Sequence, residues 1–174
     1  KTNNKTSNKT NKQPKSEKPI GPLKPINNGI IMHVAEKPSI AASIAKALSR
    51  GTNKMQKRGS IPTHDFTTTH LPFPGSTNSL TIRHRVTSVV GHVYSCDFGK
   101  EYQNWDSVDP GELFHVPVIK KANKKGIVRH LQEEAKGIHC LVLWMDCDRE
   151  GENINFEVLD VIKWSGDAHR HKIF

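Results

Sequence analysis

The segment WMDCDREGEN, residues 144–153, limits the possible folds of this chain more than any other stretch. It begins within an apolar run, Leu141 to Met145, which has the length of a buried strand, and three acids follow at every second position: Asp146, Asp148 and Glu150. If the chain stays extended past Met145, this alternation places the three carboxylates on one face at the end of the strand. Clustered carboxylates without His or Cys favour a hard cation, so we expect Mg²⁺ here, with Mn²⁺ as the alternative.

A purely structural role for these acids is the alternative. Acids in the first turn of a helix interact favourably with the positive end of the helix dipole, so an acidic helix start after a strand has the same composition. The strict spacing, the position after an apolar strand and the following Gly151 favour the metal site. Arg149, within the motif, is predicted to contact nucleic-acid phosphate, and an ion pair with Glu152 or Glu157 is equally compatible with the sequence.

A second strand, turn and helix lies near the start of the folded part. Ile30 to Ala35 is apolar and of strand length, and Glu36 and Lys37 follow it. Ser39 is expected to cap a helix that ends near Gly51. The apolar face of this helix is predicted from residues at helical spacing: Ile40, Ile44, Ala47 and Leu48.

Strands alternating with helices along the rest of the chain predict an α/β fold, with a mainly parallel, Rossmann-like sheet and helices on both faces. After the first helix we expect a loop over 52–79 with one irregular strand near Asp65 to Thr69, and then a half-buried strand from Leu80 that is stopped by Gly91 and His92; one face of this strand carries Leu80, Ile82, Val86 and Val90, and the other carries Arg83, Arg85 and Thr87. An ordered surface connection over 93–118 is expected next, followed by a helix over Lys120 to Gly137 and a strand over His139 to Met145. The last predicted elements are a helix whose apolar face carries Ile154, Val158, Leu159 and Ile162, and the start of a strand at His171 to Phe174.

Composition divides the chain in two. Residues 1–28 carry seven lysines and one glutamate, a net charge of +6 out of the total of +9, and few apolar side chains. We expect this tail and linker to be disordered, and it either attracts nucleic acid without sequence preference or is simply a solvated extension. Residues 29–174 are predicted to form one domain. The chain has no apolar stretch of membrane-spanning length and no signal-peptide pattern, and its three scattered cysteines indicate neither a disulfide framework nor a zinc ribbon.

Because the carboxyl ends of parallel strands meet at one edge of a sheet, we expect Glu36 to face the acids that follow Met145. Such an arrangement suits metal-assisted phosphoryl chemistry. Glu36 can move a proton or support the metal, and Lys37 can hold a phosphate or stabilise a leaving oxygen. His92, which follows a strand, is either structural or faces nucleic acid.

Four segments resemble one known family in the same order along the chain: VAEKPSIA (34–41), TSVVGHV (87–93), YQNWDSVDPGELF (102–114) and LWMDCDREGENINFEVLD (143–160). Together they resemble the TOPRIM domain of type IA DNA topoisomerases, most closely eukaryotic topoisomerase III and its beta form. The resemblance implies a catalytic Glu36 beside a basic Lys37. It also implies a magnesium-binding triad of Asp146, Asp148 and Glu150, and DNA contacts from Lys37, Arg149 and His92.

The family cleaves and rejoins single-stranded DNA through a tyrosyl-5′-phosphate, without ATP, and its beta form is also linked with RNA strand passage. Strand passage through the break relaxes negative supercoils. The resemblance therefore implies an ATP-independent isomerase with a nuclear location, or a cytoplasmic one as the alternative, and a Tudor-domain partner. Neither Tyr94 nor Tyr102 matches the attacking tyrosine, which the family carries in a later domain. We therefore expect a fragment of a larger enzyme that is inactive alone.

Two other functions are compatible with the same residues. A free-standing TOPRIM nuclease would use metal-activated water in place of the tyrosine, and a non-catalytic module would bind nucleic acid through its basic tail. Smaller features keep structural alternatives: His169 and His171 could bind a metal or be exposed by accident, and Tyr102 and Trp105 could stack on bases or pack a long connection.

Overall fold

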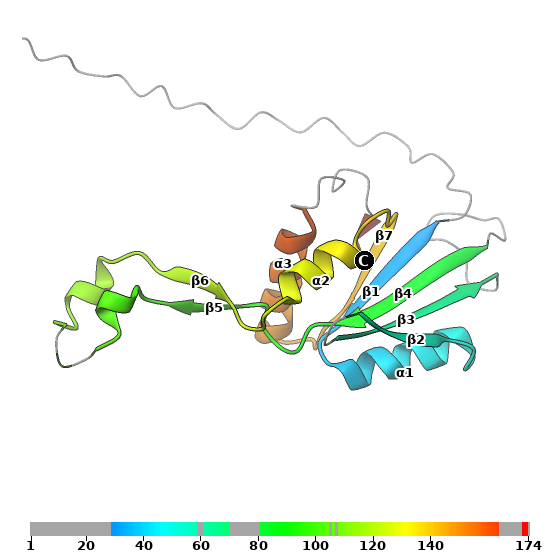
Figure 1. Cartoon of the computed structure of the whole chain (residues 1–174), viewed down its shortest axis with the longest axis horizontal. Coiled ribbons are helices and arrows are strands. Elements are labelled where there is room, and N and C mark those ends of the chain that lie inside the picture. Colours follow the sequence, from blue (N-terminus) through cyan, green and yellow to red (C-terminus); the bar gives the residue numbers. More distant parts are fainter. Residues whose placement is uncertain are drawn as a thin grey trace, which may run out of the picture.

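A computed structural model describes residues 29–58, 61–69, 81–104, 106, 108–163 and 172–173. They form a six-stranded sheet of order β2-β3-β4-β1-β7-β8 with helices on both faces, and a separate two-stranded sheet, β5-β6 (Figure 1). The strands are β1 (Ile30–Ala35), β2 (Lys54–Arg58), β3 (Ile61–Thr68), β4 (Ile82–Ser88), β5 (Tyr94–Asp97), β6 (Ile119–Ala122), β7 (Cys140–Trp144) and β8 (Lys172–Ile173). In the large sheet only β3 runs against its neighbours, so the predicted mainly parallel α/β fold is confirmed.

Strand β1 lies in the middle of the sheet, parallel to β4 on one side and to β7 on the other. Its residues from Ile31 onward are buried, as a central parallel strand covered on both faces requires. Helix α1 (Pro38–Ser49) covers one face, and helices α2 (Ile127–Glu134) and α3 (Arg149–Lys163) cover the other (Figure 1).

The larger core lies between the sheet and helices α2 and α3. Met32, Leu131, Leu141 and Ile154 are among its fully buried side chains. Burial of each such side chain contributes about 1.5–3 kcal/mol relative to exposure. This core fixes α3 against β7, and with it the first turn of α3 beside the end of that strand.

The start and the face of helix α1 differ from the prediction. Lys37 is the N-cap residue and Pro38 opens the helix, with no side chain capping it, so the expected cap at Ser39 is wrong. The pyrrolidine ring of Pro38 fixes φ near the helical value and lacks the N–H that would need a partner, which suits this position. The buried stripe is Ala41, Ala45 and Ser49, with Ile40, Ile44 and Leu48 packed beside it; Ala47 is exposed.

Strands β2 and β3 occupy a region that was expected to be mainly loop. The strand expected near Asp65 to Thr69 is present as β3, which begins earlier, at Ile61, and is regular. Strand β2 was not expected, and it pairs antiparallel with β3, as β3 does with β4. Residues 70–80, Leu80 included, lie outside the described residues.

Strand β4 is buried on both faces over its second half. Thr87, expected on a solvent face, is buried and lies 2.8 Å from His130 Nε2 of α2. Arg85 pairs with the buried Glu134, its Nε lying 3.2 Å from Oε2. Val90, expected on the apolar face, is exposed because the strand ends at Ser88.

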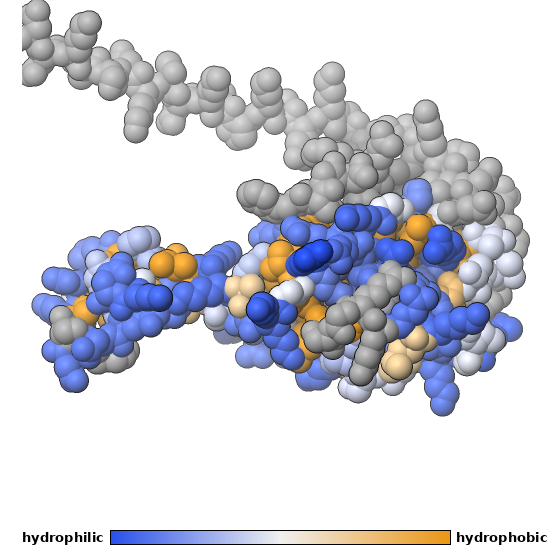
Figure 2. Space-filling model, in the orientation of Figure 1, coloured by the Kyte–Doolittle hydropathy of each residue, from blue (hydrophilic) through white to orange (hydrophobic). Residues whose placement is uncertain are grey.

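A projecting arm takes the place of the expected surface connection over 93–118. Strands β5 and β6 form an antiparallel ribbon that leaves the body and carries two short 3-10 helices, Lys100–Tyr102 and Glu112–Phe114, at its far end (Figures 1 and 2). The helix predicted from Lys120 begins only at Ile127, because Lys120 to Ala122 pair with β5 and Gly126 takes a positive φ of 87°. Phe114 near the tip is almost fully exposed.

A hydrogen-bonded series of side chains, with His33 and His84 buried and Trp144 exposed, joins β7, β1, β4 and β3 on the α1 face. Trp144 Nε1–H donates to His33 Nδ1 over 3.1 Å, so the proton of neutral His33 is on Nε2. That nitrogen lies 3.0 Å from His84 Nδ1, and His84 Nε2 lies 2.8 Å from the Thr68 hydroxyl. Burial, and then the neighbouring His84, lower the pKa of His33 to about 3. His33 is therefore neutral in the folded protein at ordinary pH.

No helix among the described residues is long and apolar enough to cross a membrane. Cys96, Cys140 and Cys147 are free thiols, of which only Cys140 is buried.

Candidate metal and phosphate site at the carboxyl edge of the sheet

The carboxyl ends of β1 and β7 lie side by side. Ala35 is in register with Trp144, so Glu36 and Met145 are the next residues on two neighbouring parallel strands. This confirms the expectation that the first strand and the acidic segment, over a hundred residues apart, end at one edge.

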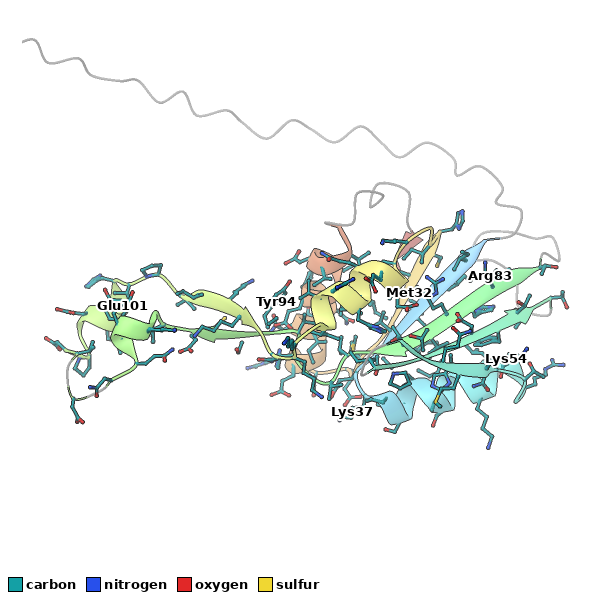
Figure 3. All side chains as sticks on the ribbon, viewed as in Figure 1. Met32, Lys37, Lys54, Arg83, Tyr94 and Glu101 are labelled. Carbon is teal, nitrogen blue, oxygen red and sulfur yellow. The ribbon has the colours of Figure 1, made fainter. Side chains whose placement is uncertain are left out.

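Lys37, at the start of α1 (Figure 3), forms an ion pair with Glu36 within the turn between β1 and α1. Lys37 Nζ lies 3.1 Å from Glu36 Oε1; the lysine side chain is exposed, while that of Glu36 is largely covered. The hydrogen bond to Glu36, and then the charge of Glu36, raise the pKa of Lys37 above its ordinary value, and Asp146 and Asp148 add to this through their charges. Three carboxylates, one that follows β1 and two that follow β7, therefore all favour the charged form of Lys37.

Asp148 and Gly151 shape the turn that follows β7. Asp148 Oδ1 accepts a hydrogen bond from Gly151 N–H at 2.7 Å, as an N-cap carboxylate does, and its carbonyl accepts from Glu152 N–H at 3.0 Å. A Cβ on Gly151 would lie 2.0 Å from the carbonyl oxygen of Asp146. Only glycine allows the helix to pass so close to the backbone that carries Asp146.

The extended arrangement predicted for the three acids is wrong. Strand β7 ends at Trp144, residues 145–148 form a turn, and Glu150 is already in the first turn of α3. Within the described part of the chain, no three carboxylates, imidazoles or thiols already form a group that could hold a metal ion. Asp146 and Asp148 are exposed, so side-chain rotations are available to them.

A pocket of about 490 Å³ lies along the same turn and the start of α3, and it includes two residues that the sequence reasoning missed. It is lined by residues 145–149 together with Glu152 and Asn155. The side-chain oxygen Oδ1 of Asn155 is buried and has no hydrogen-bond partner. Glu152 and Asn155 follow Asp148 at spacings of four and seven, a helical pattern that would have shown them on one face. Glu150 is not part of this lining.

His92 lies on the opposite flank of α3, held by that helix. Its Nδ1 is 3.3 Å from Glu157 Oε1 and 3.4 Å from Asn153 Nδ2. Glu157 is thus engaged elsewhere than with Arg149, and among the described residues Arg149 makes no ion pair with Glu152 or Glu157. The structural alternative for Arg149 is therefore not observed.

The two tyrosines lie outside this edge. Tyr94 is at the root of the arm (Figure 3), where burial, and then the charges of Asp160 and Glu157, raise its pKa. Tyr102 is in the first 3-10 helix of the arm. Trp105, His169 and His171 lie outside the described residues.

The donor set fits a hard divalent cation. Glu36, Asp146 and Asp148 supply carboxylate oxygens, which are the ligands that Mg²⁺ and Mn²⁺ prefer in proteins. Asp148 uses Oδ1 as a helix cap, which leaves Oδ2 for another partner. An edge with acids and one lysine beside them is suited to binding a phosphate through a metal ion and an ammonium group.

Comparison with known proteins gives the class first: the Toprim domain family matches residues 32–174. The chain therefore belongs to the Toprim domain family. More particularly, its domain is of the type IA topoisomerase III kind. It is 46% identical over 146 residues to DNA topoisomerase 3-beta of Arabidopsis thaliana, a match that covers 83% of this chain and 16% of that protein.

Two further relatives agree. DNA topoisomerase 3-beta of Oryza sativa subsp. japonica is 52% identical over 75% of this chain and 14% of its own length. DNA topoisomerase 3-beta-1 of Homo sapiens is 48% identical over 76% of this chain and 15% of its own length. The chain thus spans about one seventh of the length of the curated relatives it matches.

Proposed function

We propose that this chain is the metal-binding catalytic domain of a type IA topoisomerase. The whole enzyme would cleave and rejoin single-stranded DNA through a tyrosyl-5′-phosphate, for strand passage and relaxation of negative supercoils, with the tyrosine supplied from outside these residues. The observation that carries the proposal is that β1 and β7 are parallel neighbours with Ala35 in register with Trp144, so Glu36 follows one strand at the same edge where Asp146 and Asp148 follow the other.

The proposed roles follow from chemistry and position. Glu36, Asp146 and Asp148 would hold Mg²⁺, or Mn²⁺ as the alternative, and Glu150 in the first turn of α3 would join them by rotation of its exposed side chain. When bound, the ion would neutralise phosphate charge. Lys37 would hold a phosphate oxygen, and Glu36 would move the proton of the attacking or leaving hydroxyl. Arg149 and His92, both at least partly exposed, would contact the nucleic-acid backbone.

DNA is the proposed substrate, with RNA as the alternative. We further propose a nuclear location and a Tudor-domain partner for the whole protein, on family resemblance alone. The isolated chain is expected to bind nucleic acid and to leave it uncut.

The test is incubation of the 174-residue chain with single-stranded DNA, with and without Mg²⁺. Magnesium-dependent binding without cleavage supports the topoisomerase domain. Nicking that needs Mg²⁺ and disappears in Glu36→Ala would instead identify a nuclease. Affinity that ignores Mg²⁺ and is lost on removal of residues 1–28 would identify a non-catalytic binding module.

A further inference from the structure

We propose that Glu157 is a positioning residue, which orients the imidazole of His92 so that its Nε2 meets a backbone phosphate of the bound strand. This inference rests on the proposed function, because it adds a phosphate contact to the same edge of the sheet. The observations behind it are the contacts of Glu157 with His92 and Val93, in the segment that follows β4.

The backbone that leads to His92 runs beside the Glu36 turn. Val89 N–H donates to the carbonyl of Ala35 at 2.9 Å, and Gly91 N–H donates to the carbonyl of Glu36 at 3.4 Å. His92 is therefore only one residue beyond a direct backbone contact with Glu36.

One carboxylate holds both the backbone and the ring at this point. Glu157 Oε2 accepts from Val93 N–H at 2.7 Å, and Oε1 lies 3.3 Å from His92 Nδ1. Asn153 Nδ2 donates to the same Oε1 at 3.3 Å, and Asn123 Nδ2 donates to the His92 carbonyl at 2.9 Å. Glu157 is mostly buried in this role, with only 12% of its side chain exposed. An ordinary glutamate on a helix surface is exposed to water, whereas the Glu157 carboxylate is mostly buried and has three polar partners, Val93 N–H, His92 Nδ1 and Asn153 Nδ2.

Two contacts act on the tautomer of His92. A carboxylate oxygen can only accept, so the contact with Glu157 Oε1 at 3.3 Å requires the proton on Nδ1, whereas the amide of Asn153, 3.4 Å away, can only donate and requires an unprotonated Nδ1. Asn153 Nδ2 also donates to Glu157 Oε1 and the carboxylate carries the charge, so the Glu157 contact favours Nδ1–H. The side chain of His92 is 36% exposed, and Nε2 has no hydrogen-bonding partner among the described residues. In the imidazolium form, Nε2–H can donate to a phosphate oxygen while the Glu157 carboxylate balances the positive charge on the other side of the ring.

The first test is the tautomer, measured by nitrogen-15 NMR of the His92 ring in the 174-residue chain. In Glu157→Gln the amide oxygen must still accept from Val93 N–H, so the amide NH₂ faces Nδ1 and donates to it. We expect Nδ1–H in the parent chain and Nε2–H in Glu157→Gln. The same tautomer in both, with both folded, would refute the positioning role. Asp160→Asn, which removes the same charge from α3 without a contact to His92, is expected to leave the tautomer unchanged.

The second test is a double-mutant cycle on affinity for a short oligothymidylate in Mg²⁺. Removing an acid ordinarily strengthens binding to a polyanion. We expect the opposite for Glu157→Gln, a loss of about fivefold, equivalent to one good hydrogen bond. His92→Ala should lose a similar factor, and Glu157→Gln should have no further effect in that background. An equal loss in both backgrounds, or a gain like that of Asp160→Asn, would refute the inference.

The metal-dependent function and the positioning role of Glu157 are refuted by different results. If Mg²⁺-dependent DNA binding persists while His92→Ala has no effect, this inference fails and the proposed function stands. If DNA binding does not respond to Mg²⁺ while the tautomer switches as expected, the proposed metal-dependent function fails and the orientation of His92 by Glu157 stands.

Discussion

The two turns that make up the candidate site are built differently, although they follow neighbouring strands and lead into helices. The β1–α1 turn has two residues, Glu36 and Lys37, and its helix begins at Pro38 without a side-chain cap. The β7–α3 turn has four residues, 145–148, of which Asp148 caps the helix. The short turn places one acid and one base with little freedom. The longer turn offers two acids, and it depends on its glycine and its cap to hold them.

The largest expected effect comes from Gly151→Ala. The added methyl group would meet the Asp146 backbone at 2.0 Å, and neither backbone can move without displacing β7 or α3. We expect a loss of about 3 kcal/mol in the free energy of unfolding, the upper range for overpacking. Urea unfolding measures it.

The matched control is Gly51→Ala at the end of α1, where φ is 85° and no atom lies within 4 Å of the added Cβ. Only backbone strain of about 1–2 kcal/mol is expected there. If the two variants are equally destabilised, the close approach of α3 to the longer turn is not what the glycine provides.

The second largest effect is expected at the hydrogen bond between the two strands that lead into these turns, in which Trp144 of β7 donates to His33 of β1. Because the pKa of His33 is lowered to about 3 in the folded state, the unfolded chain binds a proton first as the pH falls. The contribution of His33 to the free energy of unfolding is therefore fully present above about pH 6.5 and decreases as the pH falls below that value. At pH 5 it is about 2 kcal/mol smaller. Urea unfolding at the two pH values should show a smaller loss in His33→Gln, and an undiminished loss would contradict this role.

Two substitutions of Asp148 distinguish its role as the N-cap of α3 from its proposed role as a metal ligand. Asp148→Ala should lose about 1 kcal/mol of stability because Gly151 N–H loses its acceptor. Asp148→Asn keeps an oxygen acceptor and most of that stability. Both should weaken Mg²⁺ binding. Equal stability of the two variants by urea unfolding would show that the cap contributes nothing.

The smallest effect is expected for Ser39→Ala in the short turn. The Ser39 side chain caps nothing, since Lys37 holds the N-cap position. The change in unfolding free energy should stay within about 0.5 kcal/mol, as for an ordinary surface site. A loss near 1 kcal/mol would mean that the short turn is capped after all.

Sequence patterns predicted the parts of this fold that depend on local periodicity. β1, β7 and α3 have apolar runs or helical stripes long enough to be recognised, and their order predicted that β1 and β7 end at the same edge of the sheet. The conformation of the acidic segment could not be read from spacing alone, because a period of two describes a strand until the helix dipole and the Asp148 cap favour a helical turn instead. The arm was missed because its short strands have little apolar alternation, every residue of β6 being exposed. His92 was noticed, but its partner Glu157 is 65 residues away and has no local signal.

The most direct test of a shared cation site is a Mg²⁺ titration followed by carbon-13 NMR of the side-chain carboxylates. The account predicts that the signals of Glu36, Asp146 and Asp148 shift together with one dissociation constant, and that Glu36→Gln weakens binding about tenfold or more. Shifts confined to the acids after β7, with Glu36 unmoved and Glu36→Gln without effect, would contradict it.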